Sequence, residues 1–244
     1  MADLHRYTLA KPARTLYASI TEKSAPTLDN GQKGELKYSG TWGIEKEDLD
    51  AIIPIMVGAI QAEVGAFTKP DDYFLACMSG KTAARRVREA AEFKASKPGM
   101  SQDEAFKIRE KAEKRATLYE QYAGILSASS KFDVSLARLE GGKIIDIQDS
   151  EHAKAQAGKD YFYPGSYTVP SLAFKAFRRK TMEAKDGCTA YLQNCLYIRK
   201  GEKIAGAGGP SNNDVFGNYA GYSDIDPTAG AMTNADVAGE KIEF

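Results

Sequence analysis

Two residue types that build many catalytic and metal sites are scarce in this chain of 244 residues. It has two histidines, His5 and His152, and three cysteines, Cys77, Cys188 and Cys195. Two histidines are too few for a histidine-rich metal site, and they leave few candidates for histidine-dependent catalysis. A sparse, odd set of cysteines is typical of free thiols in a reducing cytoplasm. We therefore expect a cytoplasmic protein that is not an enzyme and uses no metal or other cofactor.

Long hydrophobic runs are also missing. The longest apolar stretch, residues 51–60, is interrupted by Pro54 and Gly58, and it is far shorter than the roughly 20 residues that a membrane-spanning helix needs. The first residues, MADLHRYTLAKPAR, contain no apolar core of the signal-peptide type. We therefore expect no membrane partner and no secretion by that route.

The whole chain carries no excess of one charge, but its two parts do. The 33 basic and 33 acidic residues balance. Residues 210–244 hold six acids and one base, so residues 1–209 are net basic. The C-terminal stretch is rich in glycine and small polar residues and has no periodic apolar stripe, which is typical of disorder. We expect a folded domain over 1–209 and a flexible acidic tail over 210–244.

Hydrophobic patterns predict an α+β chain that is mainly β. Strands at both ends with helices between them favour a small antiparallel sheet or barrel with a helical insert over about 81–123. The expected helices are 45–66, 81–97 and 101–122, the last with a capping box from Ser101 to Glu104. The expected strands are 13–20, 35–44, 72–78, 132–139, 143–147, 161–169, 171–178 and 189–199.

One short motif resembles a phosphate-binding loop. Ser79-Gly80-Lys81-Thr82 follows a predicted strand and precedes a predicted helix. Such a loop also needs a glycine five residues before Gly80, where this chain has Leu75. We therefore interpret the motif as a strand-to-helix turn, with a degenerate nucleotide-binding protein as the alternative.

Two other groups of residues are weak candidates for metal binding. Asp146, Asp149, Glu151 and His152 are expected to lie in a solvated loop without further ligands. Cys188 and Cys195 are seven residues apart across a predicted strand, so counting by two places them on opposite faces. We expect neither group to form a metal site.

Basic and aromatic residues are mixed in the C-terminal third. Residues 161–209 hold eight bases against three acids, together with eight aromatic residues. Upstream, Tyr38 and Trp42 share one face of a predicted strand, and Lys131 precedes Phe132. Single-stranded nucleic acid offers phosphates to cations and unpaired bases to aromatic rings, so the pattern favours nucleic-acid binding. The alternative is a scaffold protein whose aromatics fill the core.

The C-terminal half resembles the single-stranded-DNA-binding proteins of tailed bacteriophages. The resemblance is good over 125–244 and loose over the first 80 residues, and the charged helical pair at 81–122 is a departure from the family pattern. It rests on the segments ILSASSKFDV (125–134), FYPGSYTVPSLAFKAFRR (162–179), DGCTAYLQNCLYIRKGEKIAG (186–206) and NNDVF (212–216), and on an acidic tail that ends in an aromatic residue.

The resemblance implies an OB-fold, a five-stranded antiparallel barrel that binds single-stranded DNA without strong sequence preference in phage replication, recombination and repair. It also implies a homodimer, and an acidic tail that occupies the groove or recruits phage or host replication proteins. Weak binding of duplex DNA stays open. The tail residues concerned are Asp236, Glu240, Glu243 and Phe244. The groove residues that we predict are Tyr38, Trp42, Lys131, Phe132, Tyr161, Tyr163, Tyr167, Lys175, Arg178, Arg179, Lys180, Tyr197, Arg199, Lys200 and Lys203.

Overall fold

The computed structural model describes residues 5–25, 32–179 and 185–204. By its internal contacts the chain divides into two units, Met1–Ile204 and Ala205–Phe244. The fold described here is that of the first unit. The predicted acidic tail lies outside the described residues.

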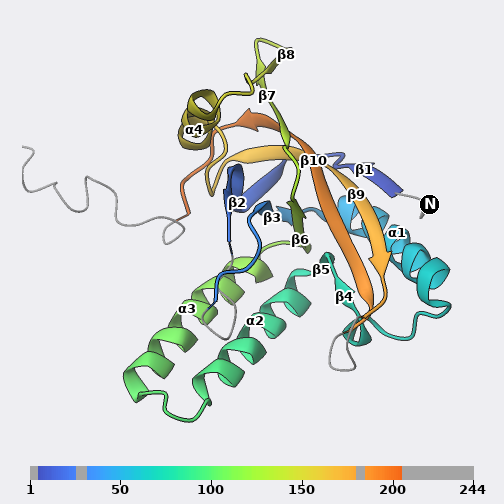
Figure 1. Ribbon diagram of the computed structural model, residues 1–244, viewed down its shortest axis with the longest axis vertical. Coiled ribbons are helices and arrows are strands. Elements are labelled where there is room, and N and C mark those ends of the chain that lie inside the picture. The colour runs from blue at the N-terminus through green and yellow to red at the C-terminus, as the bar shows by residue number, and fades with distance from the viewer. Residues whose placement is uncertain (1–4, 26–31, 180–184, 205–244) are drawn as a thin grey trace, which may run out of the picture. The chain divides into compact units, whose positions relative to one another are not determined.

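Four α-helices and a ten-stranded sheet make up the described part of the chain, which confirms the predicted α+β class (Figure 1). The helices are α1 (Lys46–Val64), α2 (Gly80–Ala95), α3 (Gln102–Glu120) and α4 (Glu151–Asp160), with a 3-10 turn at Pro70–Asp72. The strands are β1 (His5–Thr8), β2 (Ala13–Ser24), β3 (Lys37–Ile44), β4 (Phe74–Leu75), β5 (Cys77–Ser79), β6 (Gly124–Ser130), β7 (Ser135–Glu140), β8 (Lys143–Asp146), β9 (Tyr167–Phe177) and β10 (Gly187–Arg199).

The strands pair in the order β1-β9-β2-β3-β6-β10-β7-β8, with β4 added to β10 and β5 added to β6. In addition, β9 pairs with β10 along its whole length. The pairs β2–β3, β3–β6 and β9–β10 are antiparallel, whereas β10 runs parallel to β4, β6 and β7. The sheet therefore has more strands than the five-stranded barrel that the resemblance implies, and it is not antiparallel throughout.

The core is organised around the single tryptophan of the chain. Trp42 on β3 is 0% exposed, and its Nε1 donates a hydrogen bond to Thr168 Oγ1 on β9 at 2.8 Å. The same hydroxyl lies 3.0 Å from Thr15 Oγ1 on β2. Gly40 leaves room for the indole, because a Cβ there would lie 2.4 Å from Trp42 Cη2. Three neighbouring strands are thus held together at one buried polar contact.

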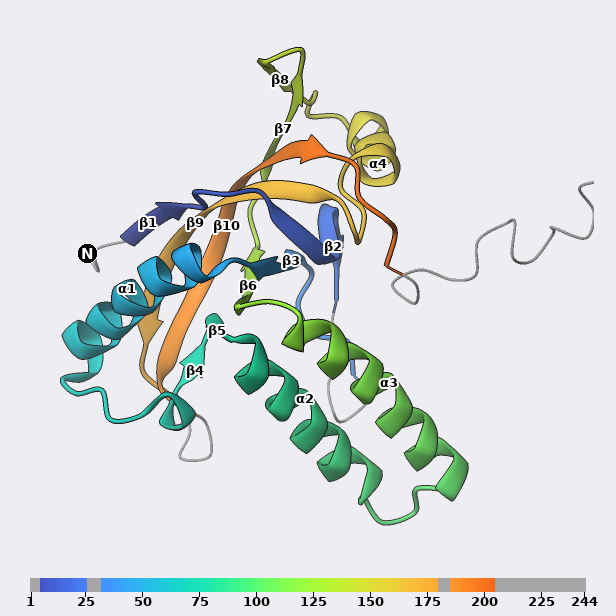
Figure 2. The ribbon, with the colours of Figure 1, turned by 180° about the vertical axis from the view of Figure 1, so that it is seen from behind.

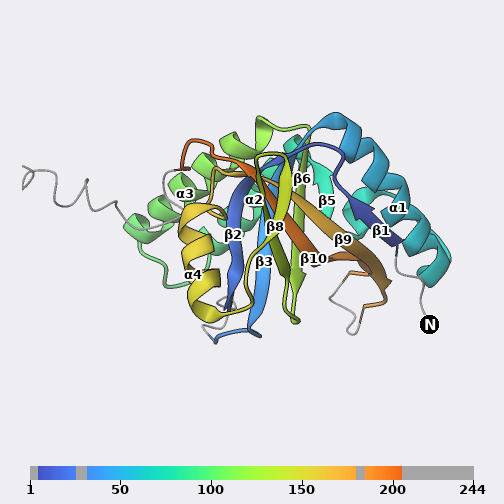
Figure 3. The same ribbon diagram turned by 90° about the horizontal axis from the view of Figure 1, so that it is seen from above.

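Helix α1 packs against β9 (Figure 2). A buried carboxylate joins the helix to β1. Asp48, in the first turn of the helix, accepts hydrogen bonds from the Tyr7 hydroxyl and from the Ala10 backbone N–H, both at 2.8 Å. Burial and this hydrogen bond raise the pKa of Tyr7 to about 12. In the view from above, the strands run between α1 and α4 (Figure 3).

Helices α2 and α3 run side by side and form the predicted helical insert (Figures 1 and 2). The predicted capping box between Ser101 and Glu104 is present at the start of α3. Arg88 joins the two helices through ion pairs to Glu113 and Glu120, at 2.7 and 2.6 Å.

Several elements differ from the sequence expectation. Helix α4 forms where a solvated loop was expected, and Tyr161–Ser166 is a turn rather than the start of a strand. Strand β9 continues through Pro170, at which we expected a break, and the carbonyl of Pro170 accepts a hydrogen bond from Leu9 N. Strand β6 was not predicted, since its serines and alanines carry little β propensity.

The last strand also corrects the expected placement of two cysteines. Cys188 and Cys195 are both buried, so they lie on the same face of β10. The register against β9 shifts by one residue between Leu192 and Asn194, and such a β-bulge exchanges the faces of the residues that follow. Burial raises the pKa of both thiols to about 12, which keeps them protonated at neutral pH.

No helix among the described residues is long and apolar enough to span a membrane. No three His, Cys, Asp or Glu side chains in the same part of the chain are grouped so that they would hold a metal ion.

The buried carboxylate gives a test of the fold. Asp48→Ala leaves the Tyr7 hydroxyl and the Ala10 N–H without their acceptor, so we expect the free energy of unfolding to fall by about 2 to 4 kcal/mol. Urea denaturation followed by Trp42 fluorescence measures this loss. The control is Asp50→Ala on the same helix, which removes an exposed pair with Lys46 and should cost no more than about 0.5 kcal/mol. Equal losses in the two variants would contradict the assignment.

Candidate nucleic-acid interface

An open hollow of about 360 Å³ lies where five strands end. Residues of β3, β4, β6, β9 and β10 contribute to it, together with the turn that follows β6. Its lining, named here the aromatic hollow, combines three aromatic rings with two lysines and three small hydroxyl side chains: Phe74, Phe177, Tyr191, Lys37, Lys131, Ser129, Ser130 and Thr189.

The aromatic rings face the hollow because of strand alternation. On β10, Ala190 and Leu192 are buried, so Tyr191 between them points outward and is 39% exposed. Phe74 on β4 is 51% exposed, and its ring centroid lies 6.1 Å from that of Phe177. Gly187 lets β4 approach β10 closely, since a Cβ at this position would lie 2.3 Å from the Phe74 carbonyl oxygen.

The floor of the hollow is formed by small side chains of β6. Tyr191 pairs with Ser129 across the parallel junction between β10 and β6. At the end of β6, Ser130 Oγ donates to the Phe132 carbonyl at 2.8 Å and accepts from the Phe132 N–H at 3.1 Å. This turn holds Lys131 at the rim and leaves Phe132 81% exposed. Small residues thus keep the space between the rings open.

The rim of the hollow carries a net positive charge. Lys131 and Lys37 share one carboxylate, Glu35, at 2.6 and 3.5 Å. The contact with Lys131 holds the pKa of Glu35 below its usual range. Lys175 lies beside the hollow, opposite Thr189 in the register of β9 and β10, and makes no ion pair with another described residue. Exposed pairs of this kind are weak, so the lysines remain available to an anion.

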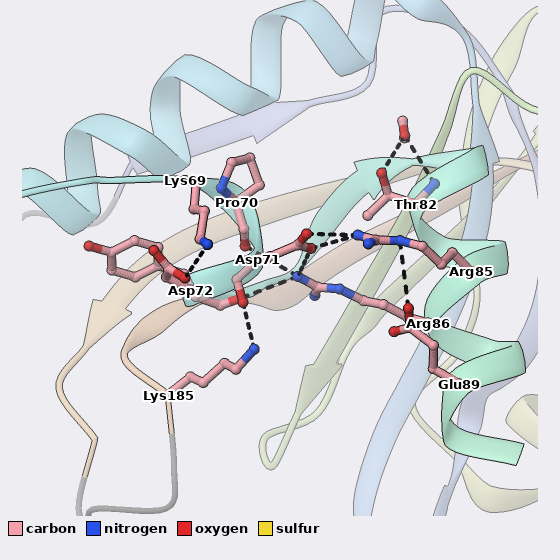
Figure 4. Close-up of polar contacts among 11 residues, drawn as sticks. Lys69, Pro70, Asp71, Asp72, Thr82, Arg85, Arg86, Glu89 and Lys185 are labelled. Atoms are coloured by element: carbon pink, nitrogen blue, oxygen red, sulfur yellow. Dashed lines mark hydrogen bonds and ion pairs between the residues drawn. The ribbon is translucent and has the colours of Figure 1, made fainter. Parts of the chain in front are cut away.

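A polar junction holds the segment that precedes Phe74 (Figure 4). Arg85 of α2 donates to both carboxylate oxygens of Asp71 at 2.8 Å, and Arg86 donates to the Pro70 carbonyl at 3.2 Å. Lys185, which precedes β10, donates to the Asp71 carbonyl at 2.5 Å. These contacts tie the turn before β4 to α2 and to the start of β10. Both arginines are therefore engaged with the turn that directly precedes Phe74.

Three aromatic residues of the predicted groove are not available to bases, which corrects the sequence prediction. Trp42 is fully buried in the core. Tyr197 is 7% exposed and packs against the rings of Tyr161 and Phe162. Tyr38 is 8% exposed, and its hydroxyl donates to Asp133 at 2.7 Å. All three lie on the inner faces of their strands.

The remaining predicted residues fall into separate groups. Lys131, Phe132 and Lys175 lie at or beside the aromatic hollow. Tyr161, at the end of α4, accepts a hydrogen bond from Arg138 at 2.8 Å. At the opposite end of β9 and β10, the structure brings together a second group, Tyr163, Tyr167, Arg199, Lys200 and Lys203.

Two predicted arginines contact neighbouring groups, Arg178 through its side chain and Arg179 through its backbone. The Arg178 guanidinium donates to the Glu63 carbonyl at 2.6 and 3.0 Å, and the Arg179 backbone N–H donates to Asp186. Lys180 and the four predicted tail residues, Asp236, Glu240, Glu243 and Phe244, lie outside the described residues.

The sequence prediction missed the residues at the centre of the hollow. Phe177 and Tyr191 were counted among the aromatics of the basic segment but were not selected, and Phe74 and Lys37 were not considered. The alternation of Tyr191 with buried small and aliphatic neighbours was a usable signal. Phe74 gave none, because its position depends on the pairing of a two-residue strand with β10.

The motif at residues 79–82 has a structural role. Thr82 N donates to Ser79 Oγ, and Gly80 N donates to the Ala123 carbonyl, so these donors already have partners. Gly80 is required by close packing, since a Cβ there would lie 2.2 Å from the Tyr122 carbonyl oxygen. The motif is therefore a capped strand-to-helix turn, as we interpreted it from the sequence.

No family model matches the chain, and no curated protein matches it. Among solved structures, it is similar to the single-stranded DNA-binding protein from bacteriophage Enc34 in complex with ssDNA, with 16% identity, a TM-score of 0.48, and coverage of 82% of this chain and 89% of that chain. A C-terminal truncation of the Enc34 protein gives 14% identity, a TM-score of 0.49 and coverage of 82% and 88%. For gp2.5, a single-stranded DNA-binding protein encoded by bacteriophage T7, the identity is 8% and the TM-score is 0.40, with coverage of 95% of this chain and 100% of that chain. All of these are phage single-stranded DNA-binding proteins, the family that the sequence resembles.

Proposed function

We propose that the chain binds single-stranded DNA in the aromatic hollow without strong sequence preference. The observation that carries the proposal is the meeting of Phe74, Phe177 and Tyr191, from three strands, around one open space with lysines at its rim. Every base has a π face, so stacking on aromatic rings tolerates any sequence and contributes about 1–3 kcal/mol per base. Exposed aromatic rings grouped in this way have no role in the core.

The lysines at the rim supply the electrostatic part of the binding. Lys37, Lys131 and Lys175 lie within or beside the hollow, and they meet phosphates while the rings hold the bases. Each phosphate neutralised releases condensed counterions, so the affinity falls as the salt concentration rises. The binding needs neither a metal nor a catalytic group.

The barrel implied by the resemblance belongs to the same proposal. The pairings run from β2 through β3, β6, β10 and β9 and back to β2, which supports a five-stranded OB-type barrel with one parallel junction. In this arrangement, the hollow lies near the first residues of β3 and β10. OB-folds bind oligonucleotides on this kind of surface.

The family resemblance supports four further proposals about the whole chain. The acidic tail at residues 210–244 competes with DNA for the basic surface and recruits phage or host replication proteins. The protein works in phage DNA replication, recombination and repair, and it forms a homodimer. Duplex DNA binds weakly, because its bases are already stacked.

Loss of a ring tests the hollow. We expect Tyr191→Ala or Phe74→Ala to weaken binding of a labelled oligothymidine about 5- to 150-fold, because each substitution removes a stacking surface. Fluorescence anisotropy over a salt series measures the affinity. The control is Phe93→Ala on α2, which removes a ring that is 68% exposed but lies outside the hollow. Wild-type affinity in both hollow variants, or an equal loss in the control, would refute the proposal.

Removal of the tail tests its proposed competition with DNA. A chain that ends at Gly209 should bind the same oligonucleotide more tightly than the full chain, most clearly at low salt, because the acidic competitor is gone. A full-length chain with the six tail acids replaced by amides separates the effect of charge from that of length. Unchanged affinity in both forms would reject the competing role of the tail and leave the hollow unaffected.

A further inference from the structure

Four side chains form a row at the other end of β9, three of them on neighbouring strands and one in the turn after α3. They alternate between aromatic rings and guanidinium groups, and we name them the Tyr–Arg row: Tyr122, Arg14, Tyr167 and Arg199. Arg14 on β2 is paired with Tyr167 on β9, and Tyr167 is paired with Arg199 on β10. Side chains at paired positions point to the same face of a sheet, so the three lie next to one another.

Close contacts hold the row together. The guanidinium carbon of Arg199 lies 3.6 Å from the centre of the Tyr167 ring. Tyr122 covers Gly43, the β3 residue paired with Arg14, since a Cβ at Gly43 would lie 2.4 Å from Tyr122 Cγ. A guanidinium stacked on a ring keeps its N–H donors directed outward, because they lie in the plane of the guanidinium group. The row therefore presents donors beside flat aromatic surfaces.

Within the described part of the chain, the cations in and beside the row have no carboxylate partner. Arg14 Nη2 donates to the Glu202 backbone carbonyl at 3.1 Å, and its Nε is buried without a hydrogen-bond partner. Among the described residues, Arg14, Arg199, Lys200 and Lys203 form no ion pair, in contrast to Arg85, Arg88 and Arg109 on the helical insert. A cluster of like charges repels itself, so this arrangement suits an anion supplied by a ligand.

We propose that the Tyr–Arg row is a second contact surface for the same DNA strand, in which the guanidinium groups bind phosphates and the tyrosine rings support bases. The proposal rests on the function proposed above. Alternation places Tyr167 on the same face of β9 as Lys175 and Phe177. Ten residues separate Tyr167 from Phe177, or about 33 Å of extended strand. A short oligonucleotide therefore fills one surface, and a longer one reaches both.

The length of the oligonucleotide separates the two surfaces in an experiment with the full chain. We expect Arg199→Ala, alone and combined with Lys203→Ala, to weaken binding of an oligothymidine of about 30 nucleotides roughly tenfold, and to reduce the salt slope by about 0.7 for each phosphate that is no longer bound. Binding of a strand of about 6 nucleotides, which the hollow holds alone, should change less than twofold. The control is Lys111→Ala, which removes an exposed cation of α3 with no ion pair among the described residues.

Thermal unfolding monitors the fold of every variant. Equal losses for the short and long strands, or no loss for either, would overturn the second surface. An equal loss in the Lys111→Ala control would show that the effect comes from the net charge of the protein, and it would also overturn the second surface. If wild-type protein binds neither strand at low salt, the proposed function itself fails. If Arg199→Ala does not fold, Lys203→Ala with Lys200→Ala decides the question by the same comparison.

Discussion

The indole N–H of Trp42 needs a hydrogen-bond acceptor, because an unpaired N–H in the core lowers the free energy of unfolding by about 1–3 kcal/mol. The acceptor is the hydroxyl of Thr168, which also lies within hydrogen-bond distance of the Thr15 hydroxyl. This buried contact therefore fixes the positions of β2, β3 and β9. Strand β9 then carries an outward-facing residue of each proposed DNA surface, Phe177 at one end and Tyr167 at the other. The two surfaces have a fixed spacing because the core fixes the strand between them.

Charge is distributed differently over the two parts of the described unit. On the helical insert, arginines face carboxylates across the helices, as in the contacts of Arg88 with Glu113 and of Arg109 with Glu92. On the sheet, the cations at the hollow and at the Tyr–Arg row have one shared carboxylate or none. These arginines of the insert are therefore neutralised within it, whereas the cations at the two sheet surfaces outnumber the carboxylates that they contact among the described residues.

Sequence patterns predicted the three longer helices but missed α4, and they predicted the outward-facing residues poorly. The spacing of apolar residues located α1, and the capping box located the start of α3, since both signals are local. Which face of a strand is exposed depends on the elements that pack against the strand, and these are distant in the sequence. Tyr38 and Trp42 were correctly placed on one face, but only the packed structure identifies that face as the inner one. Phe74 entered the hollow through a pairing that no local pattern encodes.

The bulge in β10 has a practical consequence for work on this protein. By turning Cys195 inward together with Cys188, it leaves all three thiols of the chain buried, and the pKa of each is raised to about 12. Thiols that stay protonated and inaccessible react slowly with maleimides and with oxidants. A cysteine introduced on the exposed face of α3 would then be the single reactive thiol, so a fluorophore can be attached there without alteration of the native cysteines.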